Sequence, residues 1–528
     1  MAGKPLSVQH PHADPTATTA TAASVTSGYL ERILRARVYD VAIETPLEAA
    51  PRLSSRFDNR VLFKREDLQP VFSFKIRGAY NKIAHLPVAE RERGVICSSA
   101  GNHAQGVALA ARQLGTRAVV VMPMATPRIK VEAVRAFGGE VVLHGHDYDA
   151  AYDHAREWAR KEGLVFVHPF DDPEVIAGQG TIGMEIHRQH PSPIDAIFVP
   201  IGGGGLISGI GLYTKMVFPK TRIIGVEPEE SASMDAALKA GQPVTLGRVG
   251  VFADGVAVRR VGDETFRICQ QVVDEIVQVT TDETCAAIQD IFEDTRTIVE
   301  PAGGLAVAGM KRYIQANDLR GQTLVTVNCG ANMNFDRLRH VAERAAFGEQ
   351  REALMAVEIP ERPGSFLAFC ALIGTRNVTE FNYRYSDSKV ARVFVGLELN
   401  HGAAERQDIV KALTESGHRV VDMSDNEMAK LHVRHMVGGQ APAIQNERLY
   451  RFEFPERPGA LLRFLQAIGA RWNISLFHYR NHGSDYGRVL AGIQVPQSDQ
   501  SDFEDHLREL DYPYADESQN PAYRMFLA

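Results

Sequence analysis

Short apolar runs alternate with longer segments of helical periodicity between Val61 and Asn334. The runs are continuous and rich in β-branched residues, as expected for strands buried on both faces of a parallel sheet that helices cover. They occupy residues 95–98, 118–122, 140–143, 164–167, 196–199, 223–226 and 324–327. This region therefore predicts a doubly wound α/β fold with a mostly parallel sheet, in which ligand loops follow the carboxyl ends of the strands.

Beyond this region the pattern changes and an internal repeat begins. The segment Ile-Pro-Glu-Arg-Pro-Gly-Ser-Phe-Leu at 359–367 returns 95 residues later as Phe-Pro-Glu-Arg-Pro-Gly-Ala-Leu-Leu. After a one-residue slip, the segment at 377–384 returns at 473–480. Each copy predicts a strand, a Pro-Gly turn, a helix and further strands. Two such copies indicate a duplicated α+β module.

The changes of pattern suggest where the domains begin and end. We expect a leader at 1–27, a catalytic region of two α/β subdomains at 28–335, a linker helix at 336–354, and two modules at 355–435 and 449–528. The leader is rich in Ala, Thr and Pro, and Lys4 is its sole basic residue. It has neither the apolar core of a secretory signal nor the arginines of a mitochondrial one. We therefore expect a disordered leader and a cytoplasmic protein.

Composition and charge narrow the class of function. The chain has 528 residues, of which 45% are hydrophobic and 23% charged, so it has room for several ordinary globular cores. A net charge of −7 argues against a nucleic-acid-binding surface. The five scattered cysteines predict neither a disulfide framework nor a metal site. No apolar run approaches the roughly 20 residues that span a bilayer. Small molecules are the expected partners.

A candidate Schiff-base lysine, Lys75, lies between Phe74 and Ile76. Apolar neighbours favour desolvation, which lowers the pKa of a lysine and frees its amine to attack a carbonyl. For Lys75 taken alone, a surface lysine that extends its charge into water is the simpler interpretation. Lys64 is a competitor, but the charged residues 65–67 beside it predict a solvated ion-pair cluster. Lys75 is favoured only if a cofactor site exists elsewhere.

Four consecutive glycines supply such a site. Gly202, Gly203, Gly204 and Gly205 follow the strand at 196–199 and precede a helix that opens at Leu206. Glycines allow backbone N–H groups to approach a phosphate at the positive end of a helix. A tight turn between strand and helix is the alternative, but a turn needs only one or two glycines. Phosphate binding is therefore favoured.

A second loop, formed by Ser99, Ala100, Gly101, Asn102 and His103, also follows a strand and opens a helix. Its N–H groups and polar side chains suit a carboxylate or a ring oxygen. Ser or Asn as a helix N-cap explains either polar residue equally well. His103 fits a structural role better than a catalytic one. The loop is therefore a candidate substrate site with a structural alternative.

Cys329 follows the last strand of this region, at 324–327. A free cysteine is most often a core thiol. At the carboxyl end of a strand and next to a glycine, it could instead contact a ligand. Both interpretations stay open on the residues alone.

Together these segments resemble the threonine deaminase family of fold type II, tryptophan-synthase-β-like, pyridoxal-phosphate (PLP) enzymes. The resemblance extends from about Tyr29 to Ala528 and implies a Schiff base on Lys75. Phe74 either packs near the ring or is a core phenylalanine, and both interpretations stay open. The resemblance implies that the loop from Ser99 to His103 holds the substrate carboxylate and that Asn102 bonds the ring oxygen of PLP. Gly202 to Gly205 match the phosphate loop. Cys329 lies where the family has Ser or Cys beside the pyridine nitrogen.

The resemblance also implies a reaction. L-threonine loses its α-proton to Lys75 and then its β-hydroxyl, and the enamine hydrolyses to 2-oxobutyrate and ammonia. L-serine is expected to be a poorer substrate. A neutral Cys329 cannot hold the pyridine proton as a carboxylate would, which favours prompt β-elimination.

The repeated units resemble the ACT-like regulatory domains of the biosynthetic branch of this family. This implies the first step of isoleucine biosynthesis, inhibition by isoleucine that valine opposes, and a homotetramer. The effector is expected beside each Pro-Gly turn, where helix N–H groups can meet a carboxylate. The nominated residues are Glu361, Gly364, Phe366, Glu456, Gly459 and Leu461. Each Pro-Gly is alternatively only a turn.

Two other classes of function compete with this interpretation, another enzyme activity and a protein without catalytic activity. Serine dehydratase, serine racemase and threonine synthase belong to the same fold type, but the double regulatory module argues against each. A non-catalytic amino-acid sensor is the second, and it would need no Schiff-base lysine. The set of Lys75, four glycines and Asn102 favours an enzyme.

Overall fold

The computed structural model describes residues 28–360, 368–369, 372–374, 376, 378–383, 389–435, 446–455, 472–480, 486–510 and 512–527. The expected leader and the six nominated effector residues lie outside these ranges. The chain forms two compact units. The first contains the described residues up to Val249, with Gly255–Gln278 and Gly309–Asn332. The second contains Gly250–Asp254, Val279–Ala308 and the described residues from Met333 onward.

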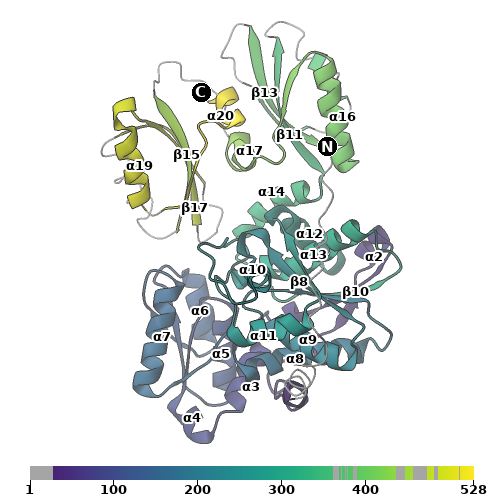
Figure 1. The fold of residues 1–528 in the computed structure, drawn as a ribbon, viewed down its shortest axis with the longest axis vertical. Helices are drawn as coiled ribbons and strands as arrows, with labels where there is room; N and C mark the ends of the chain where they lie inside the picture. Colours follow the sequence, from purple (N-terminus) through teal and green to yellow (C-terminus); the bar gives the residue numbers. More distant parts are fainter. Residues whose placement is uncertain are drawn as a thin grey trace. The chain divides into compact units, whose positions relative to one another are not determined.

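A mostly parallel sheet forms one half of the first unit (Figure 1). Its strand order is β1-β2-β10-β7-β8-β9, and β2, β10, β7 and β8 run parallel, whereas β1 is antiparallel to β2. The bounds are β1 Leu47–Ala49, β2 Arg60–Lys64, β7 Ala196–Pro200, β8 Arg222–Pro228, β9 Glu275–Val279 and β10 Thr323–Val327. Buried strands with continuous apolar runs confirm the doubly wound α/β prediction.

A second parallel sheet, in the order β5-β4-β3-β6, forms the other half of the first unit. Its strands are β3 Val95–Ser98, β4 Ala118–Met122, β5 Glu140–Leu143 and β6 Val165–Phe166. The run predicted at 164–167 is shorter as a strand, although the N–H of Val167 still donates to the carbonyl of Ile96 at 2.9 Å. Two sheets explain why the sequence showed more buried runs than one sheet would need.

Helices α3 (Lys75–Ala84), α5 (Asn102–Gln113), α8 (Pro173–Gln189) and α9 (Gly205–Val217) pack closely together. A Cβ on Gly178 of α8 would lie 2.7 Å from the Cα of Gly78 in α3. A Cβ on Gly106 of α5 would lie 3.2 Å from the carbonyl carbon of Lys75. The first turn of α3 is thus held by backbone contact on both sides. The remaining helices of this unit are α2 Pro51–Phe57, α4 Val88–Arg93, α6 Arg128–Ala136, α7 Tyr148–Glu162, α10 Ser233–Ala240 and α11 Asp263–Val272.

The second unit contains two four-stranded antiparallel sheets of the same strand order. The first sheet is β12-β13-β11-β14 and the second is β16-β17-β15-β18. Both first-listed strands carry a bulge at matching places, after Val378 and after Ile474. The bounds are β11 Glu352–Pro360, β12 Val378–Tyr383, β13 Val390–Glu398, β14 Arg419–Asp422, β15 Glu447–Pro455, β16 Asn473–Arg480, β17 Tyr486–Gln494 and β18 Tyr514–Asp516. Equal order and matching bulges confirm the predicted duplication.

The helices of the second unit are α12 Thr281–Thr295, α14 Arg337–Gly348, α16 Gly402–Glu415, α17 Glu427–Leu431, α19 Gln500–Glu509 and α20 Pro521–Phe526, and α13 Pro301–Asn317 continues from the second unit into the first. Two of them, the short helices α17 and α20, contribute to an apolar core that the two copies share. Met428 of α17 and Phe526 of α20 lie in one apolar cluster with Leu354 and Leu449 from the two sheets. Among the helices that the structure describes, none is long and apolar enough to cross a membrane.

Candidate active site

Lys75 is the first residue of α3, next to the glycine contacts that hold this helix. Its Nζ donates a hydrogen bond to the carbonyl of Pro169 at 3.0 Å and lies 5.2 Å from the centre of the Phe74 ring. Phe74 and Ile76 are buried, and Lys75 is half-buried. The amine is therefore hydrogen-bonded in a partly buried setting.

Lys64, the competing lysine, is paired as predicted, but the expectation of a solvated cluster is wrong. It is fully buried, and its Nζ donates to Glu185 Oε2 and to the carbonyl of Thr45, each at 2.6 Å. Glu185 also accepts a hydrogen bond from Arg77 at 2.6 Å, within a buried network that includes Glu66. A buried charge is retained only with such partners. Lys64 is thus fixed in an ion pair and is not a plausible Schiff-base lysine.

The loop between β3 and α5 contains the residues nominated for the substrate carboxylate. Asn102 begins α5, and its Oδ1 accepts a hydrogen bond from Nδ2 of Asn332 at 2.7 Å. Nδ2 of Asn332 also donates to the carbonyl of Val71 at 2.8 Å. The Oγ of Ser99 accepts from the N–H of Gly101 at 3.2 Å. Asn332 was not singled out in the sequence, because it follows its strand by several residues and its partner lies far away along the chain.

His103 is buried, and its Nε2 hydrogen-bonds to the carbonyl of Val167 at 2.8 Å. Burial, helped by the positive charge of Lys75, lowers the pKa of His103 to about 3. His168 lies near the same lysine, and burial lowers its pKa to about 4. Both rings are therefore neutral near pH 7. This geometry supports the structural interpretation of His103.

Gly202, Gly203 and Gly204 lie in the predicted turn between β7 and α9, and Gly205 is the first residue of α9. A Cβ on Gly203 would lie 2.3 Å from the ring of Phe170, and a Cβ on Gly202 would lie 2.9 Å from the Cα of Val256. Gly204 has a φ of +96°, a left-handed conformation that favours glycine. Close neighbours thus account for these glycines on packing grounds alone. The N–H groups of the first helical turn still have no partner within the helix and suit an anion.

Cys329 lies beside the lysine segment at the end of β10. Its carbonyl accepts a hydrogen bond from the N–H of Phe74 at 3.2 Å, and Ser73 forms an antiparallel bridge with Gly330. Cys329 is buried. The neighbouring Asn328 is also buried, and neither polar atom of its amide has a partner within the described part of the chain. Sequence reasoning missed Asn328, although a polar residue directly after a buried strand was a usable signal.

These segments converge on one place. Pro169, the partner of Lys75, precedes Phe170, which covers Gly203. Phe74 contacts the backbone of Cys329. The place thus combines an amine, a helix N-terminus fit for a phosphate and an unsatisfied buried amide. This donor set fits PLP, which needs a lysine for its carbonyl and N–H groups for its phosphate.

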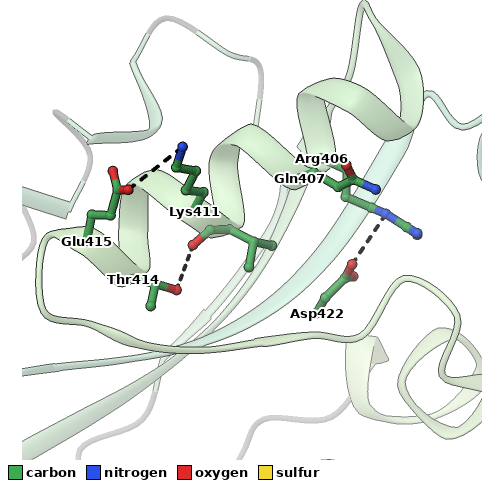
Figure 2. Close-up of a pocket in the computed structure, with 7 residues that line it drawn as sticks. Arg406, Gln407, Lys411, Thr414, Glu415 and Asp422 are labelled. Atoms are coloured by element: carbon green, nitrogen blue, oxygen red, sulfur yellow. Dashed lines mark hydrogen bonds and ion pairs between the residues drawn. The ribbon is translucent and has the colours of Figure 1, made fainter. Parts of the chain in front are cut away.

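A separate hollow of about 430 Å³ lies in the second unit, on α16 and β14 (Figure 2). Its charged residues are already paired: Arg406 with Asp422 at 3.3 Å and Lys411 with Glu415 at 3.9 Å. The hydroxyl of Thr414 donates to the carbonyl of Val410 at 2.7 Å. The charged side chains of this hollow are thus engaged with one another, and none of the nominated site residues lines it.

Known proteins match this chain over most of its length. Residues 38–330 match the family described as pyridoxal-phosphate dependent enzyme, and residues 343–433 and 438–527 match the C-terminal regulatory domain of threonine dehydratase. The chain is 57% identical over 503 residues to L-threonine dehydratase biosynthetic IlvA of Burkholderia multivorans, covering 95% of this chain and 99% of the relative. The protein of the same name from Escherichia coli is 56% identical over 500 residues, with 95% and 97% covered.

A solved structure is also similar. The processed form of threonine deaminase isoform 2 from Solanum lycopersicum aligns with a TM-score of 0.61 and 50% identity, over 61% of this chain and 89% of that one. These matches confirm the fold class, PLP as the cofactor and the double regulatory region. The chain therefore belongs to the biosynthetic L-threonine dehydratases, a family of PLP-dependent enzymes with C-terminal regulatory domains.

Proposed function

We propose that this chain is a PLP-dependent enzyme that converts L-threonine to 2-oxobutyrate and ammonia, the first step of isoleucine biosynthesis. The hydrogen bond from Lys75 to Pro169, next to the Phe170 that covers the glycine turn, carries the proposal. Through the adjacent residues 169 and 170 it relates the amine to the glycine turn, which supports a lysine-linked phosphate cofactor. The relatives' name, L-threonine dehydratase, supports threonine as the substrate.

Lys75 is the catalytic residue of this proposal. PLP, when bound, supplies the electron sink for the bond broken at the substrate Cα. Lys75 anchors the cofactor and, once displaced by substrate, removes the α-proton as general base. The neutral rings of His103 and His168 add no positive charge beside this amine. The packed first turn of α3 limits the positions its Nζ can reach.

The loop at the start of α5 binds the substrate carboxylate in this account. Ser99, Ala100, Gly101 and His103 supply the loop, and the first-turn N–H groups of α5 suit an anion. Asn332 fixes the orientation of the Asn102 amide by bonding its Oδ1. We assign the donor end of that amide to the ring oxygen of PLP, and Gly202 to Gly205 to its phosphate.

Cys329 is assigned to the pyridine nitrogen. Its backbone bond to Phe74 puts it beside the lysine segment, which supports this position. A buried thiol there would not hold a proton on the ring nitrogen as a carboxylate would, which would favour prompt loss of the substrate β-hydroxyl.

The regulatory region extends the proposal to control. We infer that isoleucine binds at the Pro-Gly turns and inhibits, that valine opposes it, and that L-serine is a poorer substrate. We further propose a homotetramer in the cytoplasm. Two copies of a regulatory domain match this chain, which supports control by a small-molecule end product.

A coupled assay for 2-oxobutyrate, with and without isoleucine, tests the proposal. We expect turnover of L-threonine that isoleucine suppresses, and a visible absorbance band that borohydride reduction abolishes. Faster formation of pyruvate from L-serine than of 2-oxobutyrate from L-threonine would contradict the substrate assignment.

A further inference from the structure

A cluster of four charged side chains joins three helices within the second unit. Asp282 comes from α12, Arg344 from α14, and Glu427 and Lys430 from α17. Arg344 donates to both carboxylate oxygens of Glu427, at 2.7 and 3.0 Å, and also bonds Asp282. Lys430 Nζ lies 2.7 Å from Asp282 Oδ2 and 2.7 Å from Glu427 Oε1. We refer to these residues as the four-residue ion cluster.

The two cations of the cluster are buried, whereas its acids are more open. The side chains of Arg344 and Lys430 are 7% and 5% exposed, and that of Glu427 is 40% exposed. Loss of solvation opposes ionisation of Glu427, but Arg344 and Lys430 outweigh it and hold its pKa at about 2. The ring of Phe347 lies 5.7 Å from Lys430 Nζ. A buried cation that loses its partner is strongly disfavoured, so the cluster resists partial disruption.

The cluster connects a regulatory helix with a helix that continues the catalytic sheet. Thr280 caps α12 directly after β9, the edge strand of the six-stranded sheet, through a reciprocal bond pair with Glu283. A Cβ on Gly348 of α14 would lie 2.0 Å from the carbonyl oxygen of Asp282, so these two helices are in backbone contact. On the other side, Met428 of α17 lies in the core shared by the two modules.

The second module does not repeat the acid and base that α17 contributes to this connection. Asn426 caps α17 and Asn520 caps α20, and the two amides lie 3.2 Å apart. Counted from these caps, Glu427 corresponds to Pro521 and Lys430 to Arg524. Pro521 carries no charge and Arg524 is exposed. The acid–base pair is therefore a property of the first module and not of the duplicated fold.

We propose that the four-residue ion cluster transmits the effector state of the regulatory modules to the catalytic domain, with the first module as the transmitting one. The inference rests on the proposed regulation by isoleucine. An effector that moves α17 must either carry α12 with it or expose a buried cation. Two discrete arrangements of packed helices, which an effector and a substrate favour differently, are what allosteric coupling requires.

Lys430→Met and Asp282→Asn in the full chain test the proposal, singly and together. Arg524→Met at the matching position of the second module is the control, and Lys430→Arg is the variant that keeps the charge. Inhibition of 2-oxobutyrate formation by isoleucine is one readout. Isoleucine binding, measured by calorimetry, is the second and separates coupling from binding. A melting temperature for each variant shows whether it is folded.

We expect Lys430→Met and Asp282→Asn each to raise the half-inhibitory isoleucine concentration by about ten-fold, within the usual range of coupling between sites. Isoleucine should still bind both variants. The double variant should add little to either single one, because both changes remove the same contact. Lys430→Arg keeps the positive charge and should retain inhibition by isoleucine. Arg524→Met should also leave this inhibition unchanged.

Normal inhibition in folded Lys430→Met and Asp282→Asn would overturn the inference and leave the proposed function intact. Loss of isoleucine binding together with inhibition would also overturn it, because the cluster would then belong to the effector site. If Lys430→Met prevents folding, Asp282→Asn decides by inhibition and by isoleucine binding, with Lys430→Arg as the variant that keeps the charge. A wild-type chain that isoleucine neither binds nor inhibits would overturn the proposed regulation itself.

Discussion

Lys75 is the residue whose side chain the proposed chemistry uses twice, as anchor and as base. Lys75→Ala should lower turnover of L-threonine by more than about 1,000-fold, because general base catalysis alone contributes about 10² to 10⁴. The borohydride-sensitive absorbance band should disappear, and the melting temperature should change little. Lys239→Ala, on the exposed surface, is the control and should behave as wild type. An intact band in Lys75→Ala would place the cofactor on another lysine.

Substitutions of Cys329 test its assignment to the pyridine nitrogen of PLP. Cys329→Ser should keep most of the activity, because a neutral hydrogen-bonding group remains. Cys329→Asp should lower kcat by about ten-fold or more, equivalent to about 1.4 kcal/mol in the barrier, by keeping the ring nitrogen protonated. Steady-state kinetics of the three proteins decide, and equal kcat values would place Cys329 away from the cofactor.

His103 and His168 give a prediction on pH. Burial lowers their pKa values to about 3 and about 4, below the value of about 6.5 for an unfolded histidine. At pH values between about 4 and about 6.5, the two histidines bind more protons in the unfolded chain than in the folded one. The free energy of unfolding therefore falls as the pH decreases through this range. Melting temperatures of wild type and His103→Gln across this range should show a smaller slope for the variant. Equal slopes would mean that His103 is protonated in the folded protein.

Some features of single residues could be predicted from the sequence, and others could not. Lys75 and the four glycines could be found, because each lies in a short segment whose local chemistry is unusual. The burial of Lys64 could not be found, since its partner Glu185 comes from a helix far along the chain. The bond between Asn102 and Asn332 was out of reach for the same reason.

At the scale of helices, the contact between α3 and α8 holds the lysine in place. Gly178→Ala puts a methyl carbon 2.7 Å from the Cα of Gly78, a backbone atom that cannot easily move aside. We expect a loss of about 1–3 kcal/mol in the free energy of unfolding, as is usual for overpacking, together with weaker PLP binding. Denaturant unfolding and cofactor titration are the measurements. Gly247→Ala, which meets no atom within 4 Å, should change neither, and wild-type stability in Gly178→Ala would refute the packing argument.

Apolar runs predicted the central strands of both sheets, because strands buried on both faces need them. The edge strand β9 was not predicted, since its residues Glu275 and Gln278 interrupt the apolar pattern. Which runs belong to each of the two predicted subdomains was not predicted, because pairing between strands is a long-range property. The duplicated module was easier to predict than the pairing of strands, because two similar segments at a nearly constant spacing indicate one fold that occurs twice.

At the scale of the whole chain, regulation should be separable from chemistry. A chain ending at Gln350 keeps every proposed catalytic residue and all of α14, but removes both modules. It should retain deamination of L-threonine and lose the response to isoleucine. Removal of the modules can expose apolar surface and cause aggregation, so its solubility must be measured first. Undiminished inhibition in the soluble truncation would place the effector site in the catalytic domain.

Point changes at the nominated effector sites avoid this difficulty. Phe366→Ala and Leu461→Ala should weaken inhibition by isoleucine and leave the rate at saturating L-threonine nearly unchanged. Because effector and substrate bias the same equilibrium, the loss should appear as a smaller isoleucine-induced shift in apparent threonine affinity. Titration of both variants with isoleucine at several threonine concentrations is the measurement. A wild-type shift in both would remove these residues from the effector site.

The rate of 2-oxobutyrate formation from L-threonine by the full chain, followed as isoleucine is added, tests the central claim most directly. We predict turnover far above that of Lys75→Ala, suppressed by isoleucine and restored by more threonine. Turnover no higher than that of Lys75→Ala, or turnover that isoleucine never suppresses, would contradict a regulated PLP-dependent threonine dehydratase.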